Sequence, residues 1–142
     1  MTRAPNLFRK IDHVELVTEQ PDRSFAFYTK VIGFRETLRQ SVRLPGNGGT
    51  LNIVYLDLGG TAVELMSYEG AQVKAAPQKP HRGYQLMALE VGDMKQTLAE
   101  LKTQGVEASW GPVDVERYVR AEILDPDGNS IELREWKQGR PA

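Results

Sequence analysis

Three ionisable residues, His13, Glu64 and Glu132, stand in predicted strands of the 142-residue chain. Both glutamates lie between hydrophobic neighbours. An imidazole and two carboxylates suit a divalent ion such as Zn, Ni, Co, Mn or Fe. Such an ion would also offset the cost of holding two carboxylates in one cleft. The same pattern fits a simpler arrangement, in which each glutamate lies on the solvent side of an antiparallel sheet and the histidine is a hydrogen-bonded surface residue. The residue types alone leave both interpretations open.

Strands must position these residues, and the hydrophobic periodicity predicts the order β-α-β-β-β in each half of the chain. In the first half we expect a helix that ends at Gly33 and strands at residues 10–17, 34–42, 51–58 and 61–67. In the second half we expect a helix from Asp93 to Gly105 and strands at residues 84–91, 106–110, 116–124 and 130–136. Gly111-Pro112 is expected to interrupt the chain after the strand at 106–110.

The two halves form an internal repeat. Gly60-Thr-Ala-Val-Glu64-Leu65 matches Gly128-Asn-Ser-Ile-Glu132-Leu133, with the glycine at the same spacing from the glutamate. One helix cannot cover both faces of a four-stranded sheet, so each repeat leaves one face free, and two free faces can form a shared cleft. Strand alternation places His13, Glu64 and Glu132 on these free faces. Glu15 and Glu90 share this phase, although they fit solvated sheet positions equally well.

Length and composition indicate a single domain, 1–142, with module one at about 8–68, a linker at about 69–82 and module two at about 83–136. Hydrophobic residues make up 40% of the chain and charged residues 26%, which is typical of a folded domain. The absence of cysteine excludes disulfides, Cys-ligated zinc, iron–sulfur clusters and thiol nucleophiles.

The net charge and the length of the apolar runs limit the binding partners and the cellular location that we expect. The net charge of -1 argues against nucleic acid or anionic membrane as a partner. The apolar runs are too short to span a bilayer. Residues 1–5 lack the apolar stretch of a signal peptide. We therefore expect a cytoplasmic protein that acts on or binds a small molecule.

Several motifs together resemble the vicinal oxygen chelate superfamily, which includes lactoylglutathione lyases, extradiol dioxygenases, methylmalonyl-CoA epimerases and bleomycin-resistance proteins. The motifs are Ile11-Asp12-His13-Val14, Ser24-Phe25-Ala26-Phe27-Tyr28 with Val31-Ile32-Gly33-Phe34, Val63-Glu64-Leu65, and Asp125-Pro126-Asp127-Gly128-Asn129 followed by Ile131-Glu132-Leu133. The resemblance extends over residues 10–136. It implies the α+β glyoxalase-like fold, in which two βαβββ modules form a curved mixed sheet around a cleft, and often a homodimer.

The resemblance also implies four metal-ligand positions, which fall on His13, Glu64, Leu86 and Glu132. Leucine cannot bind a metal, and His81 could replace Leu86 only through a distorted strand start. The missing second histidine argues against a dioxygenase, which needs two histidines and one carboxylate around iron. Val17 stands where glutathione-dependent lyases often carry an arginine, so a strict lactoylglutathione lyase is not expected.

We therefore expect a metal-dependent isomerase, epimerase or lyase of glyoxalase type. His13, Glu64 and Glu132 would hold the ion and leave positions for two neighbouring oxygens of a small α-hydroxy-carbonyl or dicarbonyl compound. The ion would stabilise an enolate, and the resemblance permits Glu132 or Glu64 to leave the ion and move the α-proton. Trp110 and Arg120 are candidate substrate contacts, although an aromatic residue there also serves packing. The alternative, favoured by Leu86, is a metal-free binding protein of the bleomycin-resistance type.

Overall fold

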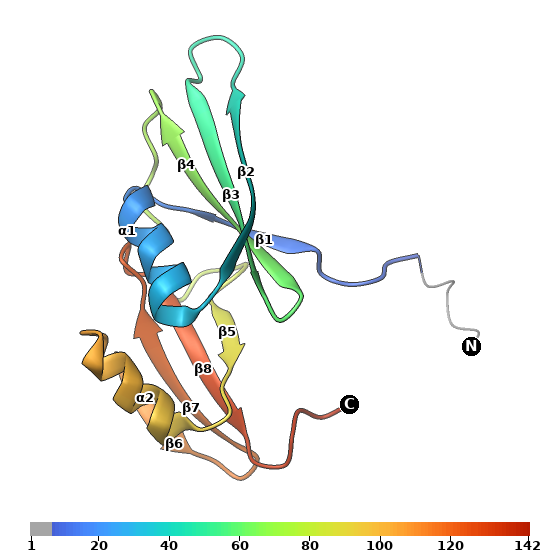
Figure 1. Cartoon of the computed structure of the whole chain (residues 1–142), viewed down its shortest axis with the longest axis vertical. Helices are drawn as coiled ribbons and strands as arrows, with labels where there is room; N and C mark the ends of the chain where they lie inside the picture. Colours follow the sequence, from blue (N-terminus) through green and yellow to red (C-terminus); the bar gives the residue numbers. More distant parts are fainter. Residues whose placement is uncertain (1–6) are drawn as a thin grey trace. The chain divides into compact units, whose positions relative to one another are not determined.

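The structure is a computed structural model that describes residues 7–142, so the expectation for residues 1–5 lies outside the described part. The chain divides into two compact units, the first ending at Val73 and the second running from Lys74 to Ala142. Each unit contains one four-stranded sheet with helical structure beside it (Figure 1). Across residues 7–142, no helix combines the length and the apolar character needed to cross a membrane.

The first unit has the predicted element order. Its elements are β1 (His13–Val17), α1 (Pro21–Ala26), the π-helix η1 (Phe27–Ile32), β2 (Arg35–Arg43), β3 (Thr50–Leu58) and β4 (Thr61–Glu69). The spatial order is β1-β4-β3-β2, and β1 runs parallel to β4 while the other neighbours are antiparallel. The helical segment ends at Gly33, as predicted, because its φ of 106° is a left-handed conformation that glycine adopts without strain.

The second unit repeats this topology. Its elements are β5 (Met87–Glu90), α2 (Met94–Thr103), β6 (Trp110–Asp114), β7 (Tyr118–Leu124) and β8 (Ser130–Trp136). The spatial order is β5-β8-β7-β6, again with one parallel pair, β5 and β8. The carboxylate of Asp93 caps α2 by accepting a hydrogen bond from the Gln96 N–H at 2.8 Å, which confirms the predicted helix start.

The position of β6 corrects the prediction of a strand at residues 106–110. The strand runs from Trp110 to Asp114 and therefore includes Gly111 and Pro112. Its pairing with β7 shifts in register between Trp110 and Val113. The prediction was wrong because a Gly-Pro pair breaks a central strand, whereas an edge strand with an irregular register accommodates it.

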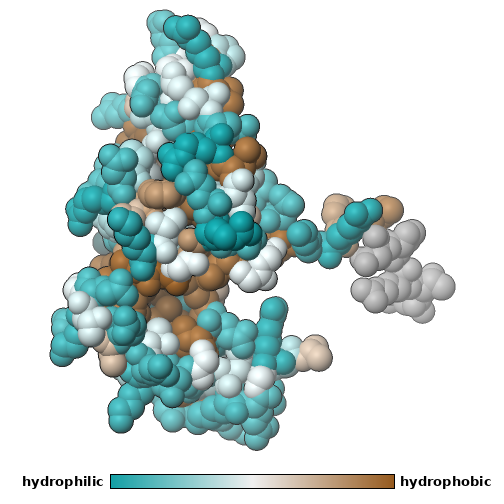
Figure 2. Space-filling view, viewed as in Figure 1, coloured by the Kyte–Doolittle hydropathy of each residue, from teal (hydrophilic) through white to brown (hydrophobic). Residues whose placement is uncertain are grey.

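Side-chain alternation gives each sheet a buried apolar face. Seven residues of these faces are each at most 3% exposed. They are Leu56, Val63 and Leu65 in the first unit, and Ala121, Ile123, Ile131 and Leu133 in the second. Glu64 and Glu132 alternate with these residues and so lie on the opposite faces. Hydrophilic residues cover most of the visible surface of each unit (Figure 2).

Gly49, in the connection between β2 and β3, has a close backbone neighbour. A Cβ there would lie 2.0 Å from the Glu69 carbonyl oxygen, and φ is +75°. Gly49→Ala is expected to lower the free energy of unfolding by about 2–4 kcal/mol, measured by urea denaturation. Gly59→Ala is the matched control, since φ is +62° there but a Cβ meets open space. If both variants lose the same free energy of unfolding, the close approach to the Glu69 carbonyl adds nothing to the strain of the positive φ.

Candidate functional site

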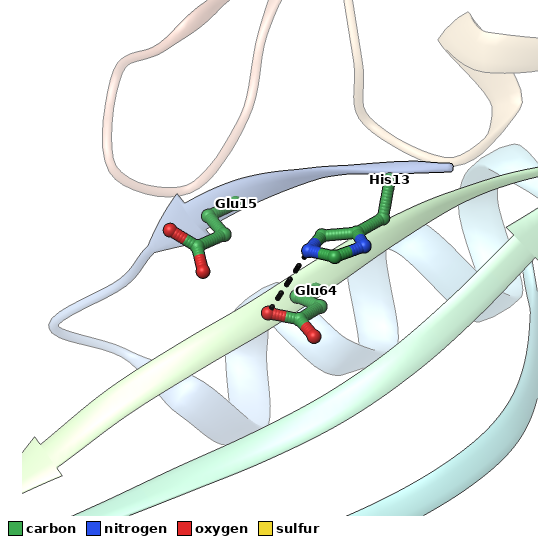
Figure 3. A group of neighbouring side chains, drawn as sticks. All are labelled: His13, Glu15 and Glu64. Carbon is green, nitrogen blue, oxygen red and sulfur yellow. Dashed lines mark ion pairs between the residues drawn. The ribbon is translucent and has the colours of Figure 1, made fainter. Parts of the chain in front are cut away.

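The first unit brings His13, Glu15 and Glu64 together, and we call these three residues the His13 cluster. His13 and Glu15 lie on β1 two residues apart, so their side chains share a face. Glu15 stands directly opposite Glu64 in the parallel pairing of β1 with β4. One ligand atom from each residue lies within 4.8 Å of the other two. Figure 3 shows the three side chains on the same side of these strands.

Glu64 is the buried member of the His13 cluster. It is 5% exposed and stands opposite Tyr55 in the β3–β4 pairing. The Tyr55 hydroxyl donates a hydrogen bond to the Glu64 carboxylate, and this bond raises the pKa of Tyr55. Tyr55 also contacts the His13 ring edge-on, with ring centroids 5.9 Å apart. Tyr55 therefore helps to fix the orientation of both side chains.

Asp12 orients the imidazole from the other side. His13 Nδ1 lies 2.8 Å from Asp12 Oδ2, and an ionised carboxylate can only accept, so Nδ1 carries the proton. The bond raises the pKa of His13 and lowers that of Asp12. The remaining ring atom, Nε2, lies 3.6 Å from Glu64 Oε2. This distance is too long for a hydrogen bond, so the Nε2 lone pair of the neutral ring is available to a ligand.

Glu132, in the second unit, has a different environment. It is 5% exposed, and each of its carboxylate oxygens has a guanidinium partner. Oε1 lies 2.8 Å from Arg120 Nη2, and Oε2 lies 2.8 Å from Arg134 Nε. Arg120 Nη2 is also 3.3 Å from Glu122 Oε2. The negative charge of Glu132 is thus compensated by two arginines of its own unit.

Aromatic rings hold both arginines. The Arg120 guanidinium lies 4.8 Å from the centroid of the Trp110 ring. The Arg134 guanidinium lies 4.0 Å from the Tyr118 centroid and 5.2 Å from that of Trp136. These distances are those of cation–π contacts. The two predicted substrate contacts, Trp110 and Arg120, therefore touch each other, and Arg120 also contacts the predicted ligand Glu132.

The pairing of β5 with β8 shows how the repeat differs at Leu86. Ala88 stands opposite Glu132, as Glu15 stands opposite Glu64. Leu86 precedes Ala88 by two residues, as His13 precedes Glu15. The second unit therefore has leucine and alanine where the first has a histidine and a glutamate.

Sequence reasoning missed Tyr55 and Asp12. Tyr55 could have been found from the two-residue turn at Gly59-Gly60, because a hairpin of that length fixes the register that places Tyr55 opposite Glu64. Asp12 gives no such signal, since a strand neighbour of His13 would be expected to point to the other face. Its carboxylate reaches the imidazole because Asp12 precedes the first residue of β1.

A cavity of about 530 Å³ lies elsewhere in the first unit. Residues of α1 and the strands β2, β3 and β4 line it, among them Phe25, Arg39, Asn52 and Tyr68. The guanidinium of Arg39 lies 5.0 Å from the Phe25 ring centroid. The lining includes no member of the His13 cluster, so the cavity and the cluster are separate features of this unit.

The donor set of the His13 cluster fits a divalent metal. It offers one imidazole nitrogen and carboxylate oxygens from two residues, a set that suits Mn, Fe, Co, Ni or Zn. Asp12 and Tyr55 hold His13 and Glu64 in the manner of the outer groups that orient metal ligands. Glu132 fits less well, because two guanidinium groups already contact its oxygens.

The two βαβββ units and the polar strand residues on their faces define a glyoxalase-like protein. The chain belongs to the Glyoxalase/Bleomycin resistance protein/Dioxygenase superfamily, whose family model matches residues 10–133. This match confirms the resemblance inferred from the sequence motifs. The comparison with curated proteins found no match.

Several solved structures have a similar fold. A glyoxalase family protein from Bacillus cereus is 23% identical, with a TM-score of 0.75 over 95% of this chain and 99% of that one. An antibiotic binding protein from Streptomyces sp. CB03234 is 24% identical, with a TM-score of 0.65 over 92% and 98%. A glyoxylase/bleomycin resistance protein/dioxygenase domain from Frankia sp. EAN1pec is 20% identical, with a TM-score of 0.69 over 94% and 96%. At these identities the likeness shows the fold alone.

Proposed function

We propose that the protein is a metal-dependent isomerase, epimerase or lyase of glyoxalase type that acts on a small α-hydroxy-carbonyl or dicarbonyl compound. The observation that carries the proposal is the His13 cluster, in which an oriented imidazole and a buried carboxylate lie 3.6 Å apart at Nε2 and Oε2. The sequence predicted Glu132 as a third ligand, but two guanidinium groups contact its oxygens, so the proposal assigns Glu132 the uptake of the α-proton. The proposal also retains the cytoplasmic homodimer that the sequence and the family resemblance imply.

The residues perform two tasks in this proposal. His13 and Glu64 would hold a divalent ion, which would supply Lewis-acid chemistry to the oxygens of the substrate. Tyr55 keeps the Glu64 carboxylate in place through its hydroxyl, and Asp12 keeps Nδ1 protonated. A carboxylate must also take up the α-proton, and Glu132 is the candidate from the sequence. Trp110 and Arg120 would contact the substrate beside Glu132, since Arg120 already touches both.

Exchange of an α-proton with solvent tests the proposal whatever the final product of the reaction is. Metal-free protein is incubated in deuterated water with a panel of α-hydroxy-carbonyl and dicarbonyl compounds, and NMR follows loss of the α-proton signal. We expect exchange of at least one compound after addition of Mn²⁺, Co²⁺, Ni²⁺ or Zn²⁺, and its loss with EDTA. The rate of α-proton exchange in Glu132→Gln is compared with the wild-type rate, and a lower rate is expected if Glu132 is the base. Absence of exchange with every ion would contradict the proposal.

A second candidate function is the metal-free binding of a small molecule. Two observations favour it: Leu86 occupies a ligand position, and arginines contact both oxygens of Glu132. Trp110, which is 44% exposed, offers a ring surface beside Arg120 to a planar ligand. The antibiotic binding protein from Streptomyces has the same fold. Thermal stabilisation by such a ligand that persists in EDTA, together with no metal binding, would favour this function.

A further inference from the structure

We propose that Glu15 is a metal ligand, so that His13, Glu15 and Glu64 form a complete divalent-cation site within the first unit. The inference rests on the metal dependence proposed above and changes the ligand set. The third protein ligand comes from β1, and Glu132 is not required to hold the ion.

The strand geometry gives Glu15 its place in the site. Glu15 is directly opposite Glu64 on the neighbouring parallel strand and two residues after His13 on the same strand. All three side chains therefore project from one face (Figure 3). Their ligand atoms lie within 4.8 Å of one another, so a modest adjustment of the exposed Glu15 side chain brings its oxygen to a shared ion.

The spacing of His13 Nε2 and Glu64 Oε2 is close to the separation that a shared ion requires. Two atoms that each lie about 2.1 Å from one ion at angles of 90–110° are about 3.0–3.4 Å apart. His13 Nε2 and Glu64 Oε2 are 3.6 Å apart, slightly beyond that separation and beyond hydrogen-bond length. Asp12 accepts the Nδ1–H at 2.8 Å and so directs Nε2, not Nδ1, toward the site.

The charges around the His13 cluster favour the binding of a cation. Glu15 and Glu64 place two carboxylates side by side, and Glu64 is 5% exposed. Among residues 7–142, no lysine or arginine forms an ion pair with either carboxylate, and His13 is the one basic side chain within 4.0 Å of Glu64. Like charges held together in a partly buried place are costly, and a divalent ion removes that cost.

The second unit provides an internal comparison. The counterpart of Glu15 is Ala88, and the counterpart of His13 is Leu86. The single carboxylate that remains, Glu132, has two arginines at 2.8 Å. In the second unit, which lacks a histidine and a second glutamate at these positions, arginines supply the positive charge. In the first unit, which has both residues, no arginine in the described part of the chain pairs with the carboxylates. This contrast indicates that an ion supplies the charge at the His13 cluster.

Binding of Mn²⁺ alone tests the inference on the full-length protein without a substrate. The wild type, Glu15→Gln and Glu132→Gln are freed of metal, and free Mn²⁺ is titrated by EPR at a temperature where circular dichroism shows all three folded. We expect about one Mn²⁺ per wild-type chain. The Kd should rise at least about tenfold in Glu15→Gln and change less than about threefold in Glu132→Gln. Glu15→Asp, which keeps the charge, should bind more tightly than Glu15→Gln.

The remaining outcomes separate this inference from the proposed function. Wild-type affinity in Glu15→Gln, with binding lost in Glu132→Gln, overturns the role of Glu15 and leaves metal dependence intact. Loss of binding in both variants shows that the site needs Glu132, which overturns its completeness within the first unit. A wild type that binds neither Mn²⁺ nor Zn²⁺, the latter followed by calorimetry, overturns both the inference and the metal-dependent function.

Discussion

The His13→Ala variant is expected to bind a divalent ion at least about a hundredfold more weakly than the wild type. His13 supplies the only nitrogen of the His13 cluster, and outer groups that merely orient a metal ligand are already worth about 10–100-fold in affinity. Any α-proton exchange should fall by about 10²–10⁴-fold, the range that one positioned catalytic group contributes. Elemental analysis of protein purified without an affinity tag shows the weaker binding as a loss of metal content. NMR in deuterated water measures the rate of α-proton exchange.

His81→Ala is the matched control, since the chain has two histidines. His81 Nδ1 bonds the neighbouring Arg82 carbonyl oxygen at 2.8 Å, and its removal should leave metal content unchanged. The His13 side chain is 31% exposed, so its replacement should cost the fold less than about 1 kcal/mol. Equal loss of metal in the two variants would mean that binding is nonspecific. Full metal content in His13→Ala would contradict the site itself.

The repeat was predictable from the sequence because its signals are local. Glycines end the helical segments, and the Gly-to-Glu spacing before Glu64 and Glu132 marks the same strand in each unit. The final strand was predicted with its observed limits, Ser130–Trp136, because a tight turn precedes it. The position of β6 was predicted wrongly. Gly111-Pro112 breaks a central strand but not an edge strand, and only the order of strands in the sheet shows that β6 is at the edge.

The candidate site was predictable as far as strand phase goes. Alternation correctly placed His13 and Glu64 on one face, and the structure brings them together. Phase alone could not decide whether Glu15 is a solvated sheet residue or part of a cluster, because that depends on the register between β1 and β4. It also could not show that Arg120 and Arg134 contact Glu132, because that requires the register of three strands.

The Glu132→Gln variant is expected to lose about 2–3 kcal/mol of unfolding free energy. Removing one partner of a fully buried ion pair costs about 3–5 kcal/mol, since the remaining charge is left uncompensated. The side chains of Arg120 and Arg134 are 28% and 25% exposed, so water partly replaces the lost carboxylate and the cost is smaller. Glutamine keeps the size of the side chain, which separates the effect of charge from that of packing. Urea denaturation at constant salt measures the change.

Glu122→Gln is the matched control on the neighbouring strand. Glu122 contacts Arg120 at 3.3 Å, but its removal leaves Arg120 paired with Glu132, so the expected loss is at most about 1 kcal/mol. If Glu132→Gln lowers the free energy of unfolding by no more than this, water alone solvates Arg120 and Arg134 well enough to replace the carboxylate. If Glu132→Gln loses much stability and little Mn²⁺ affinity, and Glu15→Gln does the reverse, then Glu132 and Glu15 have different tasks. Glu15 would then help to bind an added metal ion, whereas Glu132 would pair with Arg120 and Arg134 of its own unit.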